Sequence, residues 1–370
     1  MRILSTLLFF VCSLSHAAWA EVPFEKARMP VGVVIPLTGE VTFFGTALQQ
    51  GIQMAVSDGR TPDLNFIFED DRSGDRAATV SAIHSLVARH KVRVVIVTGM
   101  PNAVVADPIV QKEKVIALSA WDSNHAIEQL SDNTLGFGWS NEKTGQAMGN
   151  FSLKTLGART AAVVVAHDEW SEIMGQAFSN AFVAGGGKVI FHDSVELDGT
   201  DFRSLAAKIV HANPSVVYFP LYRSSLLSFA RQIKQAGYSG ILLSAEGITS
   251  AEVKQLGKLA EGMYVTGAYL DDSDFEQRYK SRIGLSKVEL NLAHVALGYD
   301  LAVFLNACVA DLLKGHEAIT IEKLRTGMAS VVVKGILGTT SFNGRKTTER
   351  EQVILQAKDG KLSRVPHTES

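Results

Sequence analysis

Cysteine is nearly absent from this chain of 370 residues, which contains Cys12 and Cys308 alone. Because Cys12 lies in a leader that we expect to be removed, the mature protein is predicted to have no intrachain disulfide. Cys308 lies in the apolar stretch 301–313, which favours a buried, inert thiol. Stability must therefore come from packing, and the chain is long enough for two cores of ordinary domain size.

A strong net charge is also missing. The formal net charge is -2 at pH 7, with 20% charged and 46% hydrophobic residues. This composition is ordinary for a globular protein and excludes the disordered and fibrous classes. Because no broad basic field is available to hold a phosphate backbone or an anionic bilayer, nucleic acid is excluded as an expected partner.

Motifs of familiar enzymes are lacking as well. The sequence has no Gly-x-Ser-x-Gly elbow, no His-Glu-x-x-His and no Gly-x-Gly-x-x-Gly after the first predicted strand. The pair His167-Asp168 is best interpreted as a loop pair. The glycines at 185–187 indicate a helix stop, because Lys188 is followed by Val and opens a strand. We therefore expect no enzymatic activity, no cofactor and no metal.

The first twenty residues are typical of a secretory signal. Arg2 precedes a short apolar run at 7–14, and small residues occupy positions 18 and 20. The run is too short to span a bilayer. Phe10-Val11-Cys12 lacks the small residue that lipid anchoring needs before the cysteine. We expect cleavage after Ala20 and a soluble, periplasmic mature protein.

From Val31 onward, short runs rich in Val and Ile alternate with longer stretches of helical period, which predicts parallel strands with crossover helices. A first series has expected strands at 31–36, 64–68, 92–97 and 115–118. A second series, after Asn141, has expected strands at 161–166, 188–192, 216–219, 241–243 and 263–265. Expected helices begin near Asn102 and Trp170 and cover 202–209 and 226–236. The helical pattern at 291–313 must pack onto one series, and no Pro-rich or Ser-rich linker separates the two.

Several short motifs, in a fixed order, carry a resemblance to a known family. They are Gly32-Val33-Val34-Ile35-Pro36-Leu37-Thr38-Gly39, Phe44-Gly45, Gly51-Ile52-Gln53-Met54-Ala55-Val56, Asp70-Asp71, Phe137-Gly138-Trp139, Ala245-Glu246-Gly247, Gly262-Met263 and Gly298-Tyr299-Asp300. Together they make the chain similar to the type I periplasmic binding proteins, particularly the leucine/isoleucine/valine-binding family.

The resemblance implies two Rossmann-like α/β lobes with parallel sheets, joined by three hinge crossings near Asn141, Ala268 and Asn343. Residues 30–141 plus 269–343 would form lobe 1, and 142–268 plus 344–366 would form lobe 2. Family members bind a ligand between the lobes, which agrees with the rule that open α/β sheets bind at the carboxyl ends of their strands.

The function implied is that of a monomeric substrate-binding component of an ABC transporter, which closes on a small molecule and delivers it to a membrane permease and its ATPase. An amino acid with an apolar or aromatic side chain is the expected ligand. The alternative is a periplasmic sensor of amides or small carboxylates that regulates a partner receptor.

On lobe 1, Met100 and Asn102 lie where a helix is expected to open, and free N–H groups and the dipole favour an anion there. Asn102 could cap that helix, contact the ligand carboxylate, or both. The resemblance implies that Ser123 donates its hydroxyl to the carboxylate. Trp121 either stacks on the ligand or fills space, and Phe44 should form part of the cleft wall.

On lobe 2, Glu246 matches the family's ammonium-binding glutamate, and Tyr222 matches a ligand-facing tyrosine. Trp170 stands where many relatives carry another tyrosine. The aromatic residues suggest an apolar or aromatic ligand side chain, although some of them could simply pack the core. Arg223 keeps open a second anionic group on the ligand.

Overall fold

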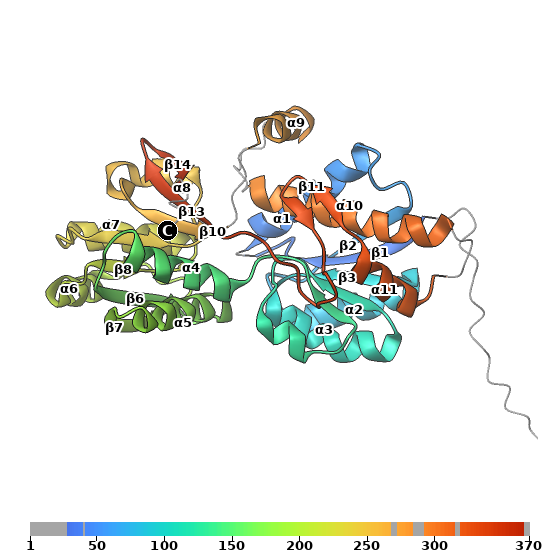
Figure 1. The fold of residues 1–370 in the computed structure, drawn as a ribbon, viewed down its shortest axis with the longest axis horizontal. Coiled ribbons are helices and arrows are strands. Elements are labelled where there is room, and N and C mark those ends of the chain that lie inside the picture. The colour runs from blue at the N-terminus through green and yellow to red at the C-terminus, as the bar shows by residue number, and fades with distance from the viewer. Residues whose placement is uncertain (1–27, 40, 268–271, 284–291, 315–318, 366–370) are drawn as a thin grey trace, which may run out of the picture.

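The computed structural model describes residues 28–39, 41–267, 272–283, 292–314 and 319–365. Two α/β lobes lie side by side along the longest axis, with the N-terminal strands in one lobe and the middle of the chain in the other (Figure 1). The predicted leader with its cleavage site after Ala20, and the crossing expected near Ala268, lie outside the described residues.

The first lobe is built on a parallel sheet, as the runs of Val and Ile predicted. In the described residues it has five strands in the order β2-β1-β3-β4-β5, and every neighbouring pair is parallel. The strands are β1 (Met29–Ile35), β2 (Leu64–Asp70), β3 (Val94–Val97), β4 (Ile116–Ser119) and β5 (Thr134–Gly136). We did not predict β5, because its three residues carry no apolar run.

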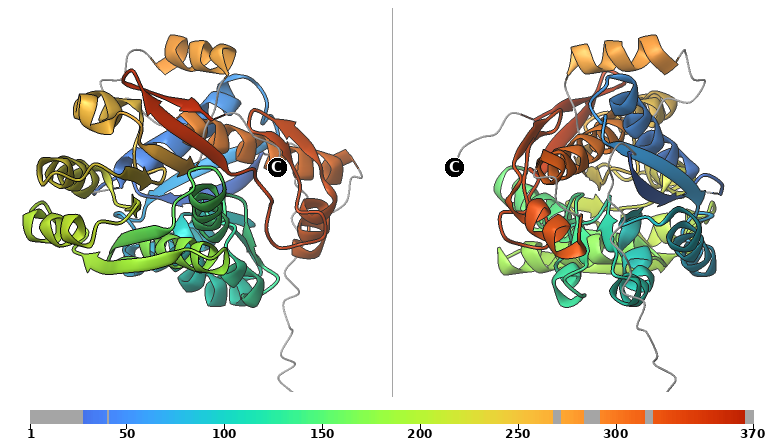
Figure 2. Two further views of the ribbon diagram at one scale, coloured as in Figure 1. Left: turned by 60° about the vertical axis from the view of Figure 1, so that its left-hand side comes forward. Right: turned by 90° about the vertical axis from the view of Figure 1, so that its right-hand side faces the viewer.

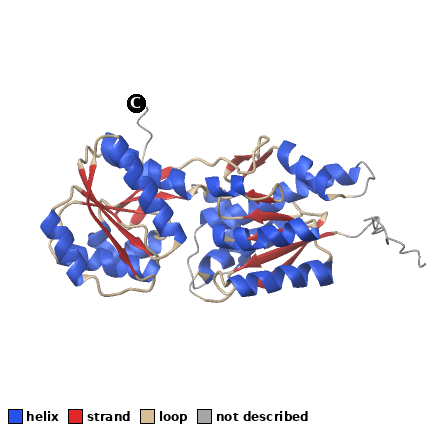
Figure 3. Ribbon diagram, turned by 90° about the horizontal axis from the view of Figure 1, so that it is seen from below, coloured by secondary structure: helices blue, strands red, loops and turns tan. Residues whose placement is uncertain are grey.

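Helices cover both faces of this sheet (Figure 3). They are α1 (Thr42–Ser57), α2 (Arg76–His90), α3 (Gly99–Glu113), α10 (Leu292–Lys314) and α11 (Ile321–Ser330), with a short 3-10 helix η1 (His125–Gln129). Also described are α9 (Ser273–Ile283), tied to α1's end by an ion pair from Arg278 to Asp58, and the hairpin β11 (Val333–Gly335) and β12 (Gly338–Thr340).

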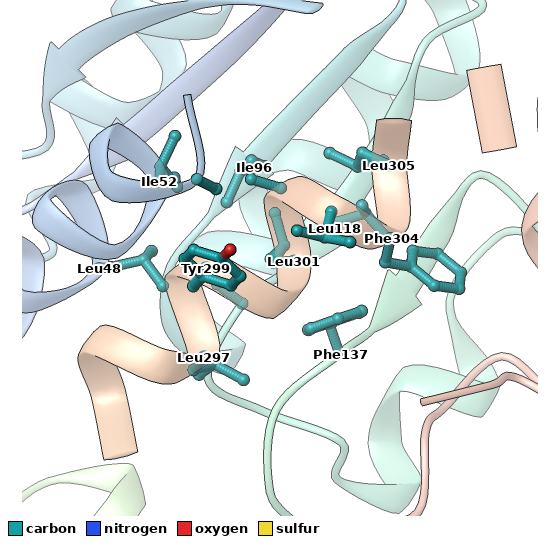
Figure 4. Packing of buried hydrophobic residues seen from close by; sticks show 14 of the residues in the cluster. Leu48, Ile52, Ile96, Leu118, Phe137, Leu297, Tyr299, Leu301, Phe304 and Leu305 are labelled. Atoms are coloured by element: carbon teal, nitrogen blue, oxygen red, sulfur yellow. The ribbon is translucent and has the colours of Figure 1, made fainter. Parts of the chain in front are cut away.

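The pattern at 291–313 forms α10, which packs on the first lobe next to α1 (Figure 4). Glycine makes this close approach possible, since a Cβ on Gly51 would meet the carbonyl of Val295 and one on Gly298 would meet that of Leu48. Within the described residues, Leu292–Ala310 is long and apolar enough to cross a membrane, but 89% of it is buried inside the protein, as in a core helix. Cys308 is buried there, as predicted.

The second lobe has a mixed sheet. Its described strands run in the order β14-β13-β10-β9-β8-β6-β7, with the five strands from the middle of the chain parallel and the C-terminal hairpin added antiparallel to β10. Figure 2 shows this hairpin, in red, at the side of the lobe. The strands are β6 (Thr160–Ala166), β7 (Lys188–Val195), β8 (Val216–Tyr218), β9 (Ile241–Ser244), β10 (Tyr264–Gly267), β13 (Val353–Lys358) and β14 (Lys361–Arg364).

Helices of the second lobe alternate with its parallel strands. They are α4 (Asn141–Lys154), α5 (Glu169–Ala184), α6 (Arg203–Ala212), α7 (Arg223–Gln235), α8 (Ser250–Leu256) and the 3-10 helix η2 (Gly257–Ala260). Helix α5 ends at the triple glycine, where Gly186 has a φ of +90°, a backbone conformation that favours glycine. These glycines therefore stop a helix, as expected.

Two connections between the lobes lie side by side. The end of β5 and the segment before β13 are joined by hydrogen bonds from the Gly136 N–H to the Lys346 carbonyl (2.8 Å) and from the Thr348 N–H to the Gly136 carbonyl (2.9 Å). The Thr348 hydroxyl also donates to the Phe137 carbonyl (2.8 Å). This pairing joins two chain segments more than 200 residues apart in sequence, and it limits how the lobes can move relative to each other.

Candidate functional site

A pocket of about 290 Å³ lies between the lobes, beyond the carboxyl ends of strands from both sheets. The first lobe contributes the segments after its five strands β1 to β5 and the start of α10, and the second contributes the segments after β6, β7, β8 and β9. Its lining residues are Pro36, Val41, Phe44, Ser73, Gly74, Thr98, Gly99, Met100, Pro101, Asn102, Trp121, Asp122, Asn124, Trp139, Asn141, Asp168, Glu169, Trp170, Ile173, Leu197, Tyr222, Glu246 and His294.

The fold brings most of the sequence-predicted residues to this pocket. Seven of the eight line it: Phe44, Met100, Asn102, Trp121, Trp170, Tyr222 and Glu246. Their positions follow from the topology, because each lies at or just after the carboxyl end of a strand or in the helix that follows it.

Ser123 is the exception and does not line the pocket. Its hydroxyl donates to the Gly138 carbonyl (2.9 Å) and lies 3.2 Å from the Thr348 hydroxyl. The side chain is thus turned toward the paired connections, where buried carbonyls need donors. The expectation that this hydroxyl faces the ligand is not met by the structure.

Asn102 also differs from its predicted geometry. Helix α3 begins at Gly99, with Thr98 at the N-cap, so Asn102 lies inside the first turn and caps nothing. Its Nδ2 donates to Oδ2 of the buried Asp71 (3.0 Å), which also accepts from the Thr98 hydroxyl (2.7 Å). Gly99 at the start of α3 has a φ of +71°, a backbone conformation that favours glycine, so the helix can begin at this residue.

Aromatic rings form walls on both sides of the pocket. On the first lobe the ring of Phe44 lies 4.7 Å from His294 and 5.6 Å from Trp121, and Trp139 lies 5.8 Å from His294. On the second lobe Trp170 and Tyr222 have their ring centroids 4.7 Å apart. A ligand with a flat or branched apolar body would have ring faces on both sides.

Asp122 was not among the predicted ligand residues, yet its buried carboxylate lines the pocket. Its Oδ1 accepts from Nδ2 of Asn141 (2.9 Å) and from Nδ2 of Asn124 (3.4 Å). The pKa of Asp122 is raised to about 7, mainly by burial and also by the nearby charge of Glu169. The hydrogen bonds from the Asn141 amide and the Met100 N–H act in the opposite direction and lower it. Its place directly after β4 is the sequence signal that could have found it.

Three more carboxylates come from the second lobe. Asp168 accepts from the Ser171 N–H at the start of α5 and from the Tyr222 hydroxyl (3.1 Å), and burial raises its pKa. Burial also raises the pKa of Glu169, which is opposed by Arg76. Nε1 of Trp170 lies 3.4 Å from Oε1 of Glu246, in hydrogen-bonding geometry. The pocket is therefore acidic on both sides.

His294 was missed because nothing in the local sequence of α10 marks it. It is 4% exposed and lines the pocket, and burial lowers its pKa to about 4, so the ring is neutral at pH 7. Arg223, predicted as a possible partner for a second anionic group, does not line the pocket. Its guanidinium pairs with the buried carboxylate of Glu252. Among the described lining residues there is no Lys or Arg.

Two lobes and a pocket lined from both define a ligand-binding clamp. Comparison with known proteins gives the family: the model described as periplasmic binding protein matches residues 29–361, so this chain belongs to the periplasmic binding protein family. The resemblance noted in the sequence is thereby confirmed.

Curated relatives carry amino-acid-binding names. The chain is 25% identical over 279 residues to the Leu/Ile/Val-binding protein homolog 3 of Brucella melitensis biotype 1, covering 72% of this chain and 73% of the relative. It is 23% identical over 253 residues to the Leu/Ile/Val-binding protein BraC3 of Rhizobium johnstonii, covering 66% and 69%.

Solved structures share the fold. A leucine-binding protein from Thermotoga maritima superimposes with a TM-score of 0.79 at 21% identity, covering 91% of this chain and 98% of its own. A solute-binding protein of an ABC transporter from Rhodopseudomonas palustris, in complex with 3,4-dihydroxybenzoic acid, gives 0.80 at 18% identity, covering 91% and 96%. The predicted fold class, with parallel α/β sheets in two lobes, is confirmed.

Proposed function

We propose that this chain is the substrate-binding component of an ABC transporter. It binds one small molecule between its lobes in the periplasm, after removal of the leader at Ala20, and presents it to a membrane permease and its ATPase. The family membership and the binding proteins among its relatives support this proposal. The lobes correspond to residues 30–141 plus 269–343 and 142–268 plus 344–366, and the paired connections near 141 and 343 act as the hinge.

The observation that carries the proposal is the composition of the interlobe pocket, with carboxylates and aromatic rings contributed by both lobes. Water is displaced when such a pocket closes, and a buried carboxylate then needs a positively charged or donating partner. The ligand we propose has a protonated nitrogen and an apolar or aromatic body. Amino acids with apolar or aromatic side chains, and their amine relatives, meet both requirements.

Binding proceeds by closure of the two lobes around the ligand. The closed state gains contacts from Trp121 and Asp122 on one side and from Trp170 and Glu246 on the other. Ligand therefore shifts a population toward the closed form by its differential affinity for that form.

Tryptophan fluorescence is a direct test of ligand binding. The sequence contains four tryptophans, of which Trp19 is in the leader and Trp121, Trp139 and Trp170 all line the pocket. A ligand that enters the pocket should therefore change the environment of all three of these tryptophans. Titration of the mature protein with such a ligand should change its tryptophan emission. A panel of amino acids, amines and aromatic acids without any fluorescence or thermal-shift response would contradict the proposal.

Glu246→Ala should weaken the binding of an ammonium-bearing ligand by roughly 2 to 4 kcal/mol, because the desolvated ammonium loses a charged acceptor. The matched control is Glu261→Ala, which removes an exposed glutamate of the same lobe outside the pocket. Its dissociation constant, measured by calorimetry, should equal that of the wild type. Equal affinities of the wild type and both variants would show that Glu246 does not bind the ligand.

A further inference from the structure

Most of the side-chain donors that line the pocket already donate to acceptors of the protein itself. On the first lobe the Thr98 hydroxyl and the Asn102 amide donate to Asp71, and the amides of Asn124 and Asn141 donate to Asp122. A ligand that needs donors would have to compete with these internal acceptors.

The same holds elsewhere in the lining. The hydroxyl of Tyr222 donates to Asp168 (3.1 Å), and Nε1 of Trp170 donates to Glu246 (3.4 Å). The Ser73 hydroxyl donates to the Thr38 carbonyl (2.8 Å). Two lining groups are exceptions: within the described part of the chain, the indole N–H of Trp121 and Nδ1 of His294 are buried without a hydrogen-bond partner.

The position where an anion would be bound is filled by a side chain of the protein. The start of α3 offers few N–H groups, since Met100 hydrogen-bonds to the carboxylate of Asp122 and Pro101 has no N–H. A Cβ on Gly99 would lie 3.8 Å from Oδ2 of Asp122, so this carboxylate lies against the first turn of α3. A ligand carboxylate brought to the same place would meet the carboxyl oxygens of Asp122 instead of free N–H groups.

Oxygen acceptors of the lining are also left without partners. Asn102 is 2% exposed and lines the pocket, and its Oδ1 has no hydrogen-bond partner among the described residues. The orientation of this amide is fixed, because its Nδ2 points to the carboxylate of Asp71. Oδ2 of Asp168 is likewise buried without a hydrogen bond in the described chain. Buried polar atoms without partners are rare in folded proteins and indicate a group that completes them.

We propose that the cargo is an organic cation, an amine with an aromatic or branched apolar body and no carboxylate, held by Asp122 and Glu246 between the aromatic walls. This inference rests on the proposed function and narrows its ligand class. Carboxylates and ring faces both favour a cation once water is displaced, and no Lys or Arg of the described lining is present to hold an anion. The proposed ligand class differs from that of the structural neighbour in complex with 3,4-dihydroxybenzoic acid, which is an aromatic acid.

Matched sets of three compounds test the inference on the mature wild-type protein. One set is phenethylamine, phenylalanine and 3-phenylpropionate, and the other is isopentylamine, leucine and 4-methylpentanoate. Within each set the apolar body is constant while the carboxylate or the amine is removed. We expect at least one amine to bind at least about tenfold more tightly than its zwitterion, measured by calorimetry and thermal shift, and neither acid to bind.

Two variants assign the effect to Asp122. Asp122→Asn should raise the dissociation constant of the amine by about tenfold to hundredfold, the range for loss of one desolvated charge-assisted contact. It should also reduce the ratio between the dissociation constants of the zwitterion and the amine. The control, Glu172→Gln, removes a negative charge from an exposed residue on α5 outside this pocket. The dissociation constants of the amine and of the zwitterion should both stay within about twofold of the wild-type values. A circular dichroism spectrum and a melting curve for each variant verify that it is folded.

The outcomes separate the two proposals. Tighter binding of an amino acid or acid than of its amine, or no response to either amine, overturns the cationic cargo while the binding-protein function stands. The absence of any stabilising solute in the wider panel overturns the function itself. Equal losses in Asp122→Asn and Glu172→Gln would overturn the role given to Asp122.

Discussion

Asp122 shows how one buried side chain joins the charge of the pocket to the stability of the fold. Its carboxylate accepts hydrogen bonds from Asn124 and Asn141, yet burial, with Glu169 and Glu142 nearby, raises its pKa from an ordinary 3.8 to about 7. Asp122 therefore ionises at a higher pH than an exposed aspartate does. A bound cation would favour the ionised form, so ligand binding near pH 7 should release protons.

The stability of the ligand-free protein should depend on Asp122 with a defined sign. Because the folded pKa is raised, the unfolded chain loses its proton first as the pH rises, and the contribution of Asp122 to the free energy of unfolding falls between pH 4 and 7, by on the order of 3 to 4 kcal/mol. In Asp122→Asn this slope should disappear. Urea unfolding measures the free energy of unfolding of both proteins at pH 5 and pH 8. The stability of Asp122→Asn relative to the wild type should be higher at pH 8 than at pH 5.

His294 contributes to the same curve with the opposite sign. Its folded pKa is lowered to about 4, so stability is lost as the pH falls below its ordinary 6.5, where the unfolded chain takes up a proton. Comparing Asp122→Asn with wild type cancels this contribution, and Glu172→Gln serves as the exposed-charge control. Parallel profiles for Asp122→Asn and wild type would contradict a raised pKa.

At the same scale, the residues predicted from sequence share a local signal. Phe44, Trp121 and Glu246 each follow an apolar run that forms a strand, so the topology of an α/β sheet places them at one edge. His294 comes from the first turn of α10 and reaches the pocket through tertiary packing. The direction of a side chain is also a tertiary property, which is why Ser123 was assigned to the ligand and instead bonds to Gly138.

At the scale of elements, segments with a continuous apolar run or a helical period were predictable, and β5 and the antiparallel hairpins were not. The parallel strands of both lobes were found because continuous runs of Val and Ile suit strands covered on both faces. β5 has three residues, and the hairpins β11–β12 and β13–β14 depend on partners distant in sequence. Such elements form because a neighbouring edge or side chain holds them, and that neighbour is invisible in the local sequence.

Asp300 is such a neighbour for the hairpin β11–β12. It is 1% exposed, and its two oxygens accept from the Ile336 N–H (2.7 Å) and the Leu337 N–H (2.8 Å) at the turn. A Cβ on Gly335 would collide with this carboxylate, so the turn is fitted closely over α10.

Asp300→Ala should therefore lower the free energy of unfolding by about 2 to 4 kcal/mol, since two partly buried N–H groups lose charge-assisted hydrogen bonds. Urea unfolding measures the loss. Asp274→Ala is the matched control, because its exposed carboxylate on α9 pairs with Arg278 at i,i+4, and the loss of such a surface pair should cost less than about 0.5 kcal/mol. Equal losses in the two variants would show that the hairpin is not held by Asp300.

For the whole molecule, the decisive feature is that one pocket is lined by segments of two separate sheets. Two lobes were expected from two α/β series, but their relative placement depends on the paired connections at Gly136 and Thr348. Hydrogen bonds between segments more than 200 residues apart carry no local sequence signal. They restrict the lobes to hinge-like motion, which is the motion that a clamp requires.

Closure of the clamp should protect both lobes at once. With a saturating ligand, hydrogen exchange should slow at residues 98–102 at the start of α3 and at residues 168–173 at the start of α5, since both segments line the same pocket. Helix α6 contributes no residue to the pocket lining and serves as the internal control. Mass action predicts about 2.7 kcal/mol of added stability at a ligand concentration of 100 times Kd. Protection confined to one lobe would mean that the ligand binds without closure, because closing brings both segments out of water together.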